Sequence, residues 1–402
     1  LIVTFHFGDE YKTIHNARQE LLAHKAVDNG AKIIIGHHPH VVQDTEIYKD
    51  AYIAYSLGNF VFDQSWSEPT MKGMLLEIKL REDGSMTVKK NLTRLNGFFQ
   101  VGIEEEGVEE EIKFETENKE KVSIGFVGDI IPGVDALMDI FDTTLSYTQM
   151  PQVMIGNFEG VVTDAENSKC NIESRSCYVF NGDGPFLRLV KDASFDVLNI
   201  ANNHFNDYGM EGQEDTLNAI KNAGLLATGM KNEITYINKN NTRIGIVGFA
   251  TNVWTNNFNE EDPVKSIIKE AGQNADIVVV VFHGGGEGDK YLNVPYGVEM
   301  YLGENRGDLR SFARLAVDSG ADMVLGSGPH VLRGMEKYKG RLIVYSLGNF
   351  ISVGATSTNG ILKLSAMLDV TLNPNGSFVS GKVHPFEINK ERAVSYTHLR
   401  AH

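Results

Sequence analysis

One block of sequence occurs twice in this chain and restricts the fold more than any other feature. Residues 31–60 and 321–350 align without a gap, and both end in the same six residues, YSLGNF. Each copy reads as an apolar strand, a turn that contains glycine, proline and histidine, and a second apolar strand. Buried strands of this kind are typical of parallel α/β sheets, in which functional groups usually lie in the turn after the strand. We therefore expect the histidine turn to carry chemistry.

The repetition continues on the N-terminal side of this block. FHFGDEY at 5–11 corresponds to FHGGGEG at 282–288, and LAHKAVDNGA at 22–31 corresponds to FARLAVDSGA at 312–321. The second pair has apolar residues at helical spacing and a glycine near its end, as expected of a helix that leads into the next strand.

The repetition predicts two units, and 402 residues is more than one domain usually holds. Residues 1–100 are predicted to be the C-terminal part of a truncated first domain, and residues 122–390 a complete domain of the same kind. The glutamate-rich segment 101–121 is predicted to be an acidic, solvated linker. Residues 391–402 continue no pattern and are expected to be a non-native tail. Because the chain opens at Leu1 inside an apolar strand, we expect a preceding segment, which could hold a signal or an anchor, to be missing.

Within residues 122–390, apolar segments alternate with amphipathic ones. The pattern predicts helices at about 211–224 and 308–319 and a C-terminal hairpin around the Asn-Pro-Asn-Gly turn at 373–376. Such a mixture predicts a layered α/β domain. Apolar strands are predicted at 122–129, 152–160, 195–204, 242–250, 275–285, 322–330 and 341–350.

Six polar residues share one property, which is that each closes one of these strands. Because side chains at the carboxyl ends of neighbouring strands converge on one crevice, we expect them to form a site. Carboxylate, amide and imidazole groups are ligands that suit Mn, Fe or Zn. Taken singly, each has a simpler interpretation, since an aspartate or asparagine can cap a turn and a strand-end histidine is more often structural. The six residues are Asp129, Glu159, Asn203, His204, His283 and His330.

The charge of the chain limits its partners. A formal net charge of −16 repels nucleic acid and other polyanions unless a cation or a basic patch reverses the field, so no nucleic-acid partner is expected. The sequence holds no run of 18 or more apolar residues. Cys170 and Cys177, the only cysteines, lie in a polar stretch and could either pair or remain free thiols.

Residues 122–390 resemble the CapA family of poly-γ-glutamate capsule synthesis proteins, itself similar to the calcineurin-like metallophosphoesterases. The N-terminal fragment resembles the same family through HFGDEY, GHHPHVVQ and YSLGNFVFDQ. The motifs of the complete domain follow one another in order: GD at 128–129, NFE at 157–159, ANNH at 201–204, HGGGEG at 283–288, GENRGD at 303–308, GSGPHV and YSLGNF.

The resemblance implies a four-layer α/β/β/α sandwich of metallophosphoesterase type, preceded by a partial copy of the same domain, with one or two divalent ions (Mn, Fe or Zn) at the strand ends. It implies that His204 protonates a leaving oxygen and that a metal-bound hydroxide is the nucleophile. Glu287 would act beside the substrate, and Arg306 and Ser327 would contact it, Arg306 as a bidentate partner for carboxylate or phosphate. The implied metal ligands are Asp129, Glu159, Asn203, His283 and His330.

Two positions depart from the family pattern. Metallophosphoesterases carry Asp-x-His at the first strand, but here Ile131 stands two positions after Asp129. The complete domain also has Ser327 and Gly328 where the fragment has His37 and His38. Fewer imidazoles would leave one metal ion rather than two, or a site that binds without turnover.

Three functions follow as alternatives. The first is a metal-dependent hydrolase or transferase of capsule biosynthesis that acts on a phosphoester or an amide-linked anionic polymer. The second is a non-catalytic component that binds such a polymer or acts as a scaffold, with membrane capsule-synthesis proteins as partners. The third is a domain with a degenerate, metal-free site. By the resemblance, the protein would lie at the cell envelope, outside the cytoplasm, anchored through the missing N-terminus, and residues 1–100 alone would be inactive.

Overall fold

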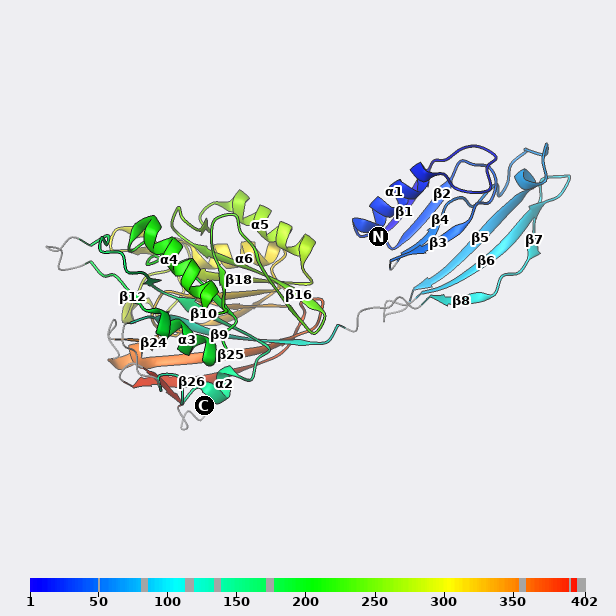
Figure 1. The fold of residues 1–402 in the computed structure, drawn as a ribbon. Helices are drawn as coiled ribbons and strands as arrows, with labels where there is room; N and C mark the ends of the chain where they lie inside the picture. Colours follow the sequence, from blue (N-terminus) through cyan, green and yellow to red (C-terminus); the bar gives the residue numbers. More distant parts are fainter. Residues whose placement is uncertain are drawn as a thin grey trace. The chain divides into compact units, whose positions relative to one another are not determined.

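The chain divides into two units, Leu1–Asn118 and Lys119–His402, each with its own hydrophobic core. Figure 1 shows the computed structural model of the chain as a ribbon. Among the residues that it describes, no helix is long and apolar enough to cross a membrane. The structure describes residues 1–49, 51–80, 86–112, 119–133, 139–170, 177–353, 359–389 and 392–395.

A mostly parallel sheet covered by one helix forms the first half of the first unit. The strand order is β1-β2-β4-β3, in which only β3 is antiparallel to its neighbour. Helix α1 begins with a capping box, because the side chains of Asn16 and Gln19 each accept a hydrogen bond from the backbone of the other. Its buried residues Ala23 and Val27 pack against Ile53 of the sheet. The elements are β1 (Ile2–His6), α1 (Ala17–Asp28), β2 (Ile33–His37), β3 (Thr45–Tyr48) and β4 (Ala51–Ala54).

A second, antiparallel sheet packs against the first one. Met74 and Val88 of this sheet share a buried cluster with Ile33 and Tyr52 of the parallel sheet. Strands β5, β7 and β8 all pair with β6. The elements are η1 (Pro69–Met71), β5 (Lys72–Leu80), β6 (Met86–Leu95), β7 (Val101–Glu105) and β8 (Glu109–Ile112).

Part of the acidic segment 101–121 is therefore not the linker that the sequence predicted. Its first residues form β7 and β8, and pairing with β6 satisfies their backbone groups. Basic residues of β5 and β6 offset the glutamates, since Arg94 Nη1 of β6 lies 2.6 Å from Glu104 Oε1 and Lys79 of β5 pairs with Glu109. Residues 113–118 of the expected linker lie outside the described residues.

The larger sheet of the second unit has the order β14-β13-β10-β9-β25-β26-β27, and β24 also pairs with β9. Residues 392–395 of the segment expected to be a tail form β27 on the edge of this sheet, and 396–402 lie outside the described residues. The strands are β9 (Val122–Ile131), β10 (Val153–Phe158), β13 (Val197–Asn199), β14 (Leu226–Thr228), β24 (Asn349–Ser352), β25 (Leu364–Leu372), β26 (Phe378–Asn389) and β27 (Arg392–Ser395).

The smaller sheet of the second unit has the order β15-β16-β18-β21-β23-β22, with β17 paired to β16. Its part β18-β21-β23-β22 has the same order and the same antiparallel last strand as β1-β2-β4-β3 in the first unit. The strands are β15 (Thr235–Lys239), β16 (Thr242–Ala250), β17 (Asn256–Asn257), β18 (Ile277–His283), β21 (Met323–Ser327), β22 (Met335–Tyr338) and β23 (Arg341–Val344).

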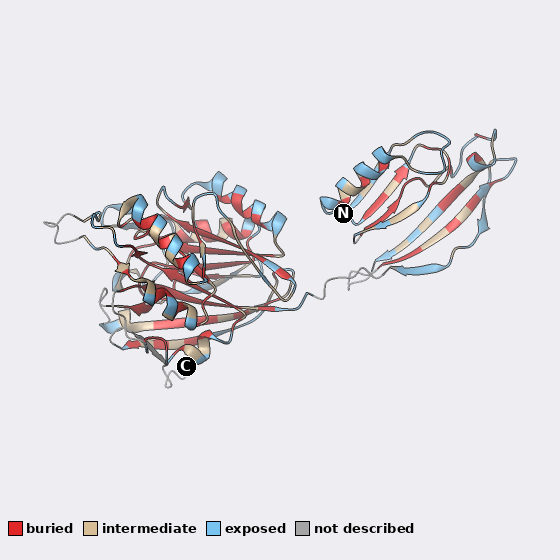
Figure 2. Ribbon diagram, in the orientation of Figure 1, coloured by how far each residue is buried: buried red, intermediate tan, exposed pale blue. Residues whose placement is uncertain are grey.

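The two sheets of the second unit face each other. Phe126 and Ile155 of the larger sheet share a buried cluster with Ile246 and Val279 of the smaller one. Helices α3 and α4 pack on the larger sheet and α5 and α6 on the smaller one, and Figure 2 shows their buried and exposed residues alternating. The helices are α2 (Leu145–Thr148), α3 (Gly184–Asp192), α4 (Gly209–Asn222), α5 (Glu261–Asn274) and α6 (Leu309–Asp318). Shorter elements are β11 (Val161–Val162), β12 (Asn181–Gly182), η2 (Asp289–Tyr291), β19 (Met300–Tyr301), β20 (Glu304–Asn305) and η3 (Gly360–Lys363).

Candidate metal centre

Three buried side chains from three strands converge in the second unit. Asp129 lies in β9, Glu159 directly follows β10, and His283 ends β18. One ligand atom from each of them lies within 4.8 Å of the other two. Because β9 and β10 belong to the larger sheet and β18 to the smaller one, this buried triad joins the carboxyl ends of both sheets.

His330 reaches the buried triad from the turn after β21. Its Nδ1 lies 2.7 Å from Asn349 Oδ1 and 3.1 Å from Asp129 Oδ2, so the Nδ1 proton is donated to these oxygens. Its Nε2 lies 3.8 Å from Glu287 Oε2. The imidazole of His330 therefore lies near the carboxylates of both Asp129 and Glu287.

Asn157, at the end of β10, connects the triad to the interior. Its Nδ2 donates to Asp129 Oδ1 at 2.8 Å and lies 3.1 Å from His283 Nδ1. Its Oδ1 accepts a hydrogen bond from Asn199 Nδ2 at 2.8 Å. The amide thus fixes one aspartate and one histidine of the triad at the same time.

Glu159 is the least satisfied polar group of the site. It is fully buried, and neither of its carboxylate oxygens has a hydrogen-bond partner among the described residues. Burial raises the pKa of Glu159 well above its ordinary value, although the charge of His330 acts in the opposite direction. A buried carboxylate without partners is costly unless a proton or a cation neutralises it.

The pKa shifts of the other titratable groups differ in direction from residue to residue. Burial alone would raise the pKa of Asp129, but hydrogen bonds from His283 and His330 outweigh it and lower that pKa. Burial alone would lower the pKa of His330, but the negative charge of Glu159 and the hydrogen bond to Asp129 raise it to about 10. For His283, burial dominates and lowers the pKa in spite of Asp129.

The unpaired atoms of the site fit a divalent cation. His283 Nε2 and Asn203 Oδ1, like the Glu159 oxygens, are buried without a hydrogen-bond partner among the described residues. Carboxylate and amide oxygens and imidazole nitrogens are the donors that Mn, Fe or Zn accept. The structure is therefore compatible with a divalent metal site at the triad.

His204 lies beside the triad with a partner of its own. Its Nδ1 lies 2.8 Å from Asp207 Oδ2, and its Nε2 lies 3.9 Å from Glu159 Oε1. The ring of Phe180 stacks on the imidazole at 4.0 Å. Burial lowers the pKa of His204, and the hydrogen bond to Asp207 opposes this shift. Because Asp207 binds the Nδ1 proton, Nε2 is the nitrogen that faces the triad.

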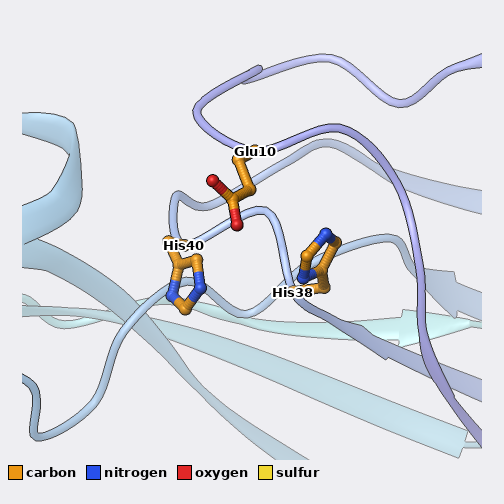
Figure 3. A group of neighbouring side chains, drawn as sticks. All are labelled: Glu10, His38 and His40. Atoms are coloured by element: carbon orange, nitrogen blue, oxygen red, sulfur yellow. The ribbon is translucent and has the colours of Figure 1, made fainter.

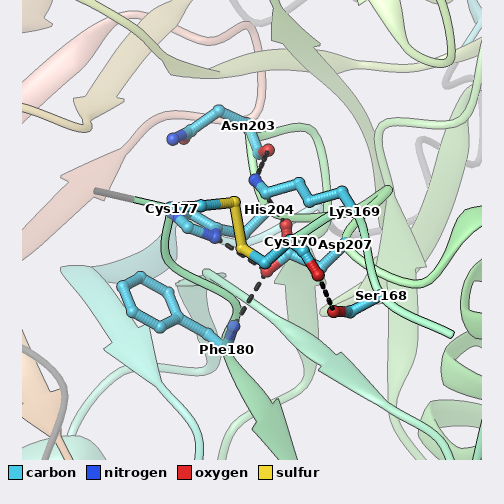
Figure 4. Close-up of a disulfide and its surroundings, with 8 residues drawn as sticks. All are labelled: Ser168, Lys169, Cys170, Cys177, Phe180, Asn203, His204 and Asp207. Atoms are coloured by element: carbon cyan, nitrogen blue, oxygen red, sulfur yellow. Dashed lines mark hydrogen bonds and ion pairs between the residues drawn. A yellow bond between two sulfur atoms is a disulfide. The ribbon is translucent and has the colours of Figure 1, made fainter. Parts of the chain in front are cut away.

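A disulfide lies close in sequence to two residues that contact Asp207, the partner of His204. Cys170 and Cys177, whose pairing the sequence left open, are bonded to each other (Figure 4). On one side of the disulfide, Lys169 Nζ lies 2.6 Å from Asp207 Oδ1. On the other side, the backbone N–H of Phe180 donates to Asp207 Oδ2 at 2.8 Å. The disulfide therefore links the contacts that orient the partner of the site histidine.

A pocket of about 590 Å³ opens beside the triad, and Asn203, His204 and His330 line it. Arg306 and Glu287 form another part of its wall, where Arg306 Nη2 donates to Glu287 Oε1 at 2.5 Å. Arg306 Nε also lies 3.2 Å from Glu304 Oε2. The guanidinium expected to face the substrate therefore stands on the pocket wall but is already paired with glutamates.

Ser327, expected to contact the substrate, lies behind the triad. It is fully buried, and its hydroxyl lies 3.3 Å from His283 Nδ1 and donates to the Phe282 carbonyl at 3.3 Å. It is not one of the described residues that line the pocket. This position suits support of His283 better than contact with a substrate.

Three residues that orient the site were not singled out from the sequence: Asn157, Asp207 and Asn349. Two of them carried a signal, since Asp207 follows His204 by three residues and Asn349 stands in the YSLGNF block that also contains Asn59. Asn157 offered its place at a strand end and in the NFE motif at 157–159. Their roles depend on contacts between distant segments, which spacing does not reveal.

A family model described as "Bacterial capsule synthesis protein PGA_cap" matches residues 1–64 and 123–353. The chain is similar to the PGA biosynthesis protein CapA of Bacillus subtilis (strain 168), with 34% identity over 298 aligned residues that cover 67% of this chain and 73% of that protein. It is also similar to the capsule biosynthesis protein CapA of Bacillus anthracis, with 32% identity over 290 residues, 65% of this chain and 66% of that protein.

Among solved structures, the chain matches the 5'-nucleotidase precursor from Thermus thermophilus with a TM-score of 0.38 and 12% identity. The match covers 68% of this chain and 56% of that one. A score this low supports no statement about fold or function.

Proposed function

Because the chain belongs to the bacterial capsule synthesis protein (PGA_cap) family, we propose that its second unit is a metal-dependent hydrolase or transferase of capsule or poly-γ-glutamate biosynthesis. Its substrate is a phosphoester or an amide-linked anionic polymer. The observation that carries this proposal is Glu159, a fully buried carboxylate whose two oxygens have no hydrogen-bond partner among the described residues. His283 Nε2, which also lacks a hydrogen-bond partner there, lies 3.6 Å from Glu159 Oε1.

In this proposal Asp129, Glu159 and His283 hold the cation, and Asn203 and His330 are further ligands. When bound, a divalent cation supplies a positive charge that polarises the scissile group and lowers the pKa of water at the site. The amide group of Asn157 holds the side chains of Asp129 and His283 in position. Ser327 supports His283 from behind.

His204 is the residue that exchanges a proton with the leaving oxygen. Its Nδ1 is bound to Asp207, so the exchange takes place at Nε2. A carboxylate in this position orients the imidazole and stabilises its protonated form. Proton transfer by a positioned side chain typically contributes about 10²- to 10⁴-fold to the rate.

Glu287 and Arg306 complete the proposed site on the pocket wall. Glu287 lies between two positive groups, because its Oε1 accepts from Arg306 and its Oε2 lies 3.8 Å from His330 Nε2. An anionic substrate group would compete with Glu287 for the guanidinium, which offers several donors in one plane. In this proposal Arg306, once released from Glu287, together with a bound cation would let a chain with a net charge of −16 accept an anion.

The proposal extends to the fold, with the second unit as a four-layer α/β/β/α sandwich and the first as a partial copy of it. The shared order of four strands and a shared backbone contact support the copy. Tyr11 N–H donates to the Pro39 carbonyl at 2.8 Å, and Gly288 N–H donates to the Pro329 carbonyl at 2.9 Å. Lacking the strands that carry the carboxylates, the first unit would not turn over substrate by itself.

A non-catalytic role is the second candidate, and two positions favour it. Ile131 is a buried apolar residue in β9 where a second histidine would stand in related phosphoesterases, and Gly328 has no side chain. In that case the pocket would bind an anionic polymer at the cell envelope, and the protein would act as a scaffold for membrane capsule-synthesis proteins.

The test uses the full chain, loaded in turn with Mn, Fe or Zn and offered phosphomonoesters, phosphodiesters and poly-γ-glutamate. We expect metal uptake and turnover, and we expect His204→Ala to lose about 10²- to 10⁴-fold in rate while it keeps the metal. His24→Ala, which removes an imidazole of the first unit, is the control. Metal uptake without turnover on every substrate would favour the scaffold, and turnover that survives metal removal would refute the proposed centre.

A further inference from the structure

Arg333 and Glu299 form a buried ion pair in the second unit. The side chain of Arg333 is 0% exposed and that of Glu299 is 2% exposed. Nη1 and Nη2 of Arg333 donate to the two carboxylate oxygens of Glu299 at 2.9 and 2.8 Å. Neither residue is among the described residues that line the pocket. Because two charges are costly to bury, the other contacts of this pair indicate what it holds in place.

The pair holds the loop that follows β18. Arg333 Nη2 donates to the Gly286 carbonyl at 3.2 Å, and the Gly286 N–H donates to Glu299 Oε2 at 3.0 Å. Arg333 Nε donates to the Tyr291 carbonyl at 2.6 Å. The pair thus binds both backbone groups of Gly286, and the next residue in the chain is Glu287, which lines the pocket. The position of Glu287 therefore depends on the pair.

The same pair holds the segment that carries Arg306. The N–H of Arg306 donates to the Glu299 carbonyl at 2.8 Å, and the Glu299 N–H donates to the Gly307 carbonyl at 3.0 Å. The Gly285 N–H in turn donates to the Arg306 carbonyl at 2.8 Å. The two residues that pair on the pocket wall, Glu287 and Arg306, are therefore fixed through one buried ion pair.

The aligned position of the first unit makes similar contacts without a charge. Gln43 aligns with Arg333, and the backbone N–H of each donates to the serine carbonyl of its own YSLGNF block, at 3.1 and 3.0 Å. Gln43 Nε2 donates to the carbonyls of Lys12 and Ile14 at 3.0 and 3.2 Å, directly after the segment that corresponds to the loop after β18. In both units this position therefore ties that part of the chain to the repeated block. Only the guanidinium adds a bidentate contact with a carboxylate.

We propose that Arg333 is a positioning residue of the pocket. Through Glu299 it holds Glu287 and Arg306 in the arrangement that receives the anionic group of the substrate, and it does not touch the substrate itself. The inference rests on the proposed function, because it concerns the anion that the pocket would take. Arginine suits this task because its planar guanidinium presents several donors in fixed directions, which a lysine ammonium does not.

The experiment compares the full chain with Arg333→Lys, which keeps a positive charge beside Glu299 but loses the planar set of donors. Calorimetry on metal-loaded protein freed of excess metal should show an affinity for inorganic phosphate that is at least about tenfold weaker. With a phosphoester that the wild type turns over, KM should rise by a similar factor. The value of kcat should change little, because His204 is oriented by Asp207 and not by this pair.

Arg341→Gln is the matched control, because it breaks another ion pair of the smaller sheet. Arg341 Nη2 lies 3.0 Å from Asp322 Oδ1, and Asp322 precedes β21 at the end of that strand opposite Ser327. This variant should bind phosphate as tightly as the wild type. The number of phosphate ions bound per chain separates positioning from a structural effect, since partial unfolding would lower that number and leave the affinity unchanged.

Each further outcome decides for or against the inference. If Arg333→Lys does not fold, the double variant Arg333→Gln, Glu299→Gln replaces it, because it removes both buried charges together. Unchanged phosphate affinity in the folded variant, or a loss of kcat with unchanged KM, would overturn the inference. A wild type without turnover whose phosphate affinity falls in the variant would refute the proposed hydrolase or transferase and leave Arg333 as a positioning residue. A wild type that binds no phosphate would overturn the inference as well.

Discussion

The two histidine turns, residues 37–40 and residues 327–330, have the same backbone but different surroundings. At their second and fourth positions, φ is +102° and +59° in the first unit and +114° and +57° in the second. In both turns the last histidine meets an asparagine of the YSLGNF block, with His40 Nδ1 3.0 Å from Asn59 and His330 Nδ1 2.7 Å from Asn349. The conformation of the turn is thus a property of the repeated block.

The two turns differ in the side chains that lie next to them. His330 meets Asp129 and lies near Glu159, which come from strands that precede the repeated block in the second unit. In the first unit, His40 meets His38 and Glu10, which all lie in the repeated part itself. The comparison teaches that one turn conformation occurs beside two different groups of side chains, one with two carboxylates and one imidazole and the other with one carboxylate and two imidazoles (Figure 3).

The largest effect is expected for Glu159→Gln, which has no counterpart in the first unit. The variant should lose the second-unit metal, with an affinity at least about 100-fold weaker. The metal-free variant should unfold at a temperature similar to that of the metal-free wild type, because the raised pKa of Glu159 already favours a neutral carboxyl in the absence of the metal. Elemental analysis and thermal unfolding in chelator check both. Exposed Glu166→Gln is the control, and a metal content of Glu159→Gln equal to that of the wild type would contradict the assignment.

Reduction of the disulfide should lower the stability of the second unit and not that of the first. Both cysteines lie in the second unit, so a reducing agent should lower the free energy of unfolding of that unit by about 2–4 kcal/mol and leave the first unit unchanged. Denaturant unfolding followed by hydrogen exchange distinguishes the units. The double variant Cys170→Ser, Cys177→Ser should no longer respond to the reductant. An equal loss in both units would show that the disulfide is not the cause.

The two turns can be exchanged at one position. Gly328→His should destabilise the second unit by about 1–3 kcal/mol, because a Cβ there would meet the Gly284 carbonyl oxygen at 2.8 Å in a backbone conformation that suits glycine. His38→Gly should leave the unfolding free energy of the first unit within about 1 kcal/mol. Exposed Gly334→His is the control for an added imidazole, since nothing lies within 4 Å of its Cβ position. A Gly328→His variant as stable as the wild type would show that the turns differ in more than this side chain.

The smallest effect concerns a hydrogen bond that both units share. Tyr55 donates to Glu46 Oε2 at 2.6 Å and Tyr345 donates to Glu336 Oε2 at 2.9 Å, and burial raises the pKa of both phenols above the ordinary value. Because the raised pKa belongs to the folded state, the stabilisation is present below about pH 10, the unfolded value, and is lost as the pH rises above it.

Each Tyr→Phe variant should therefore cost about 1 kcal/mol at pH 8 and show a flatter alkaline loss of stability than the wild type. Urea unfolding between pH 8 and pH 11 measures this for each unit. Similar results for Tyr55→Phe and Tyr345→Phe would support the likeness of the units. If the free energy of unfolding depends on pH in both variants as it does in the wild type, groups other than these two tyrosines cause the dependence.

Most errors of the sequence interpretation fall on segments whose structure depends on a distant partner. The glutamate-rich residues of β7 and β8 were predicted to be a linker. Their strands are stabilised by pairing with β6 and by basic residues such as Arg94, and a local sequence pattern does not show these distant contacts. Residues 392–395 likewise gain their strand from β26. By contrast, the helix predicted at 308–319 is confirmed as α6, because its apolar spacing is a local signal.

The sequence alone determined the repeated block, the main apolar strands and two of the helices of the second unit (about 211–224 and 308–319), and the strand-end residues of the candidate site, because each of these depends on neighbours along the chain. Only the tertiary structure decided which of those residues meet. It placed Asp129, Glu159 and His283 together, moved Ser327 behind them and paired Arg306 with Glu287. It also left Glu159 buried without a hydrogen-bond partner among the described residues. The physical reason is that burial and charge pairing are set by segments far apart in sequence, so they exist only once the sheets have packed.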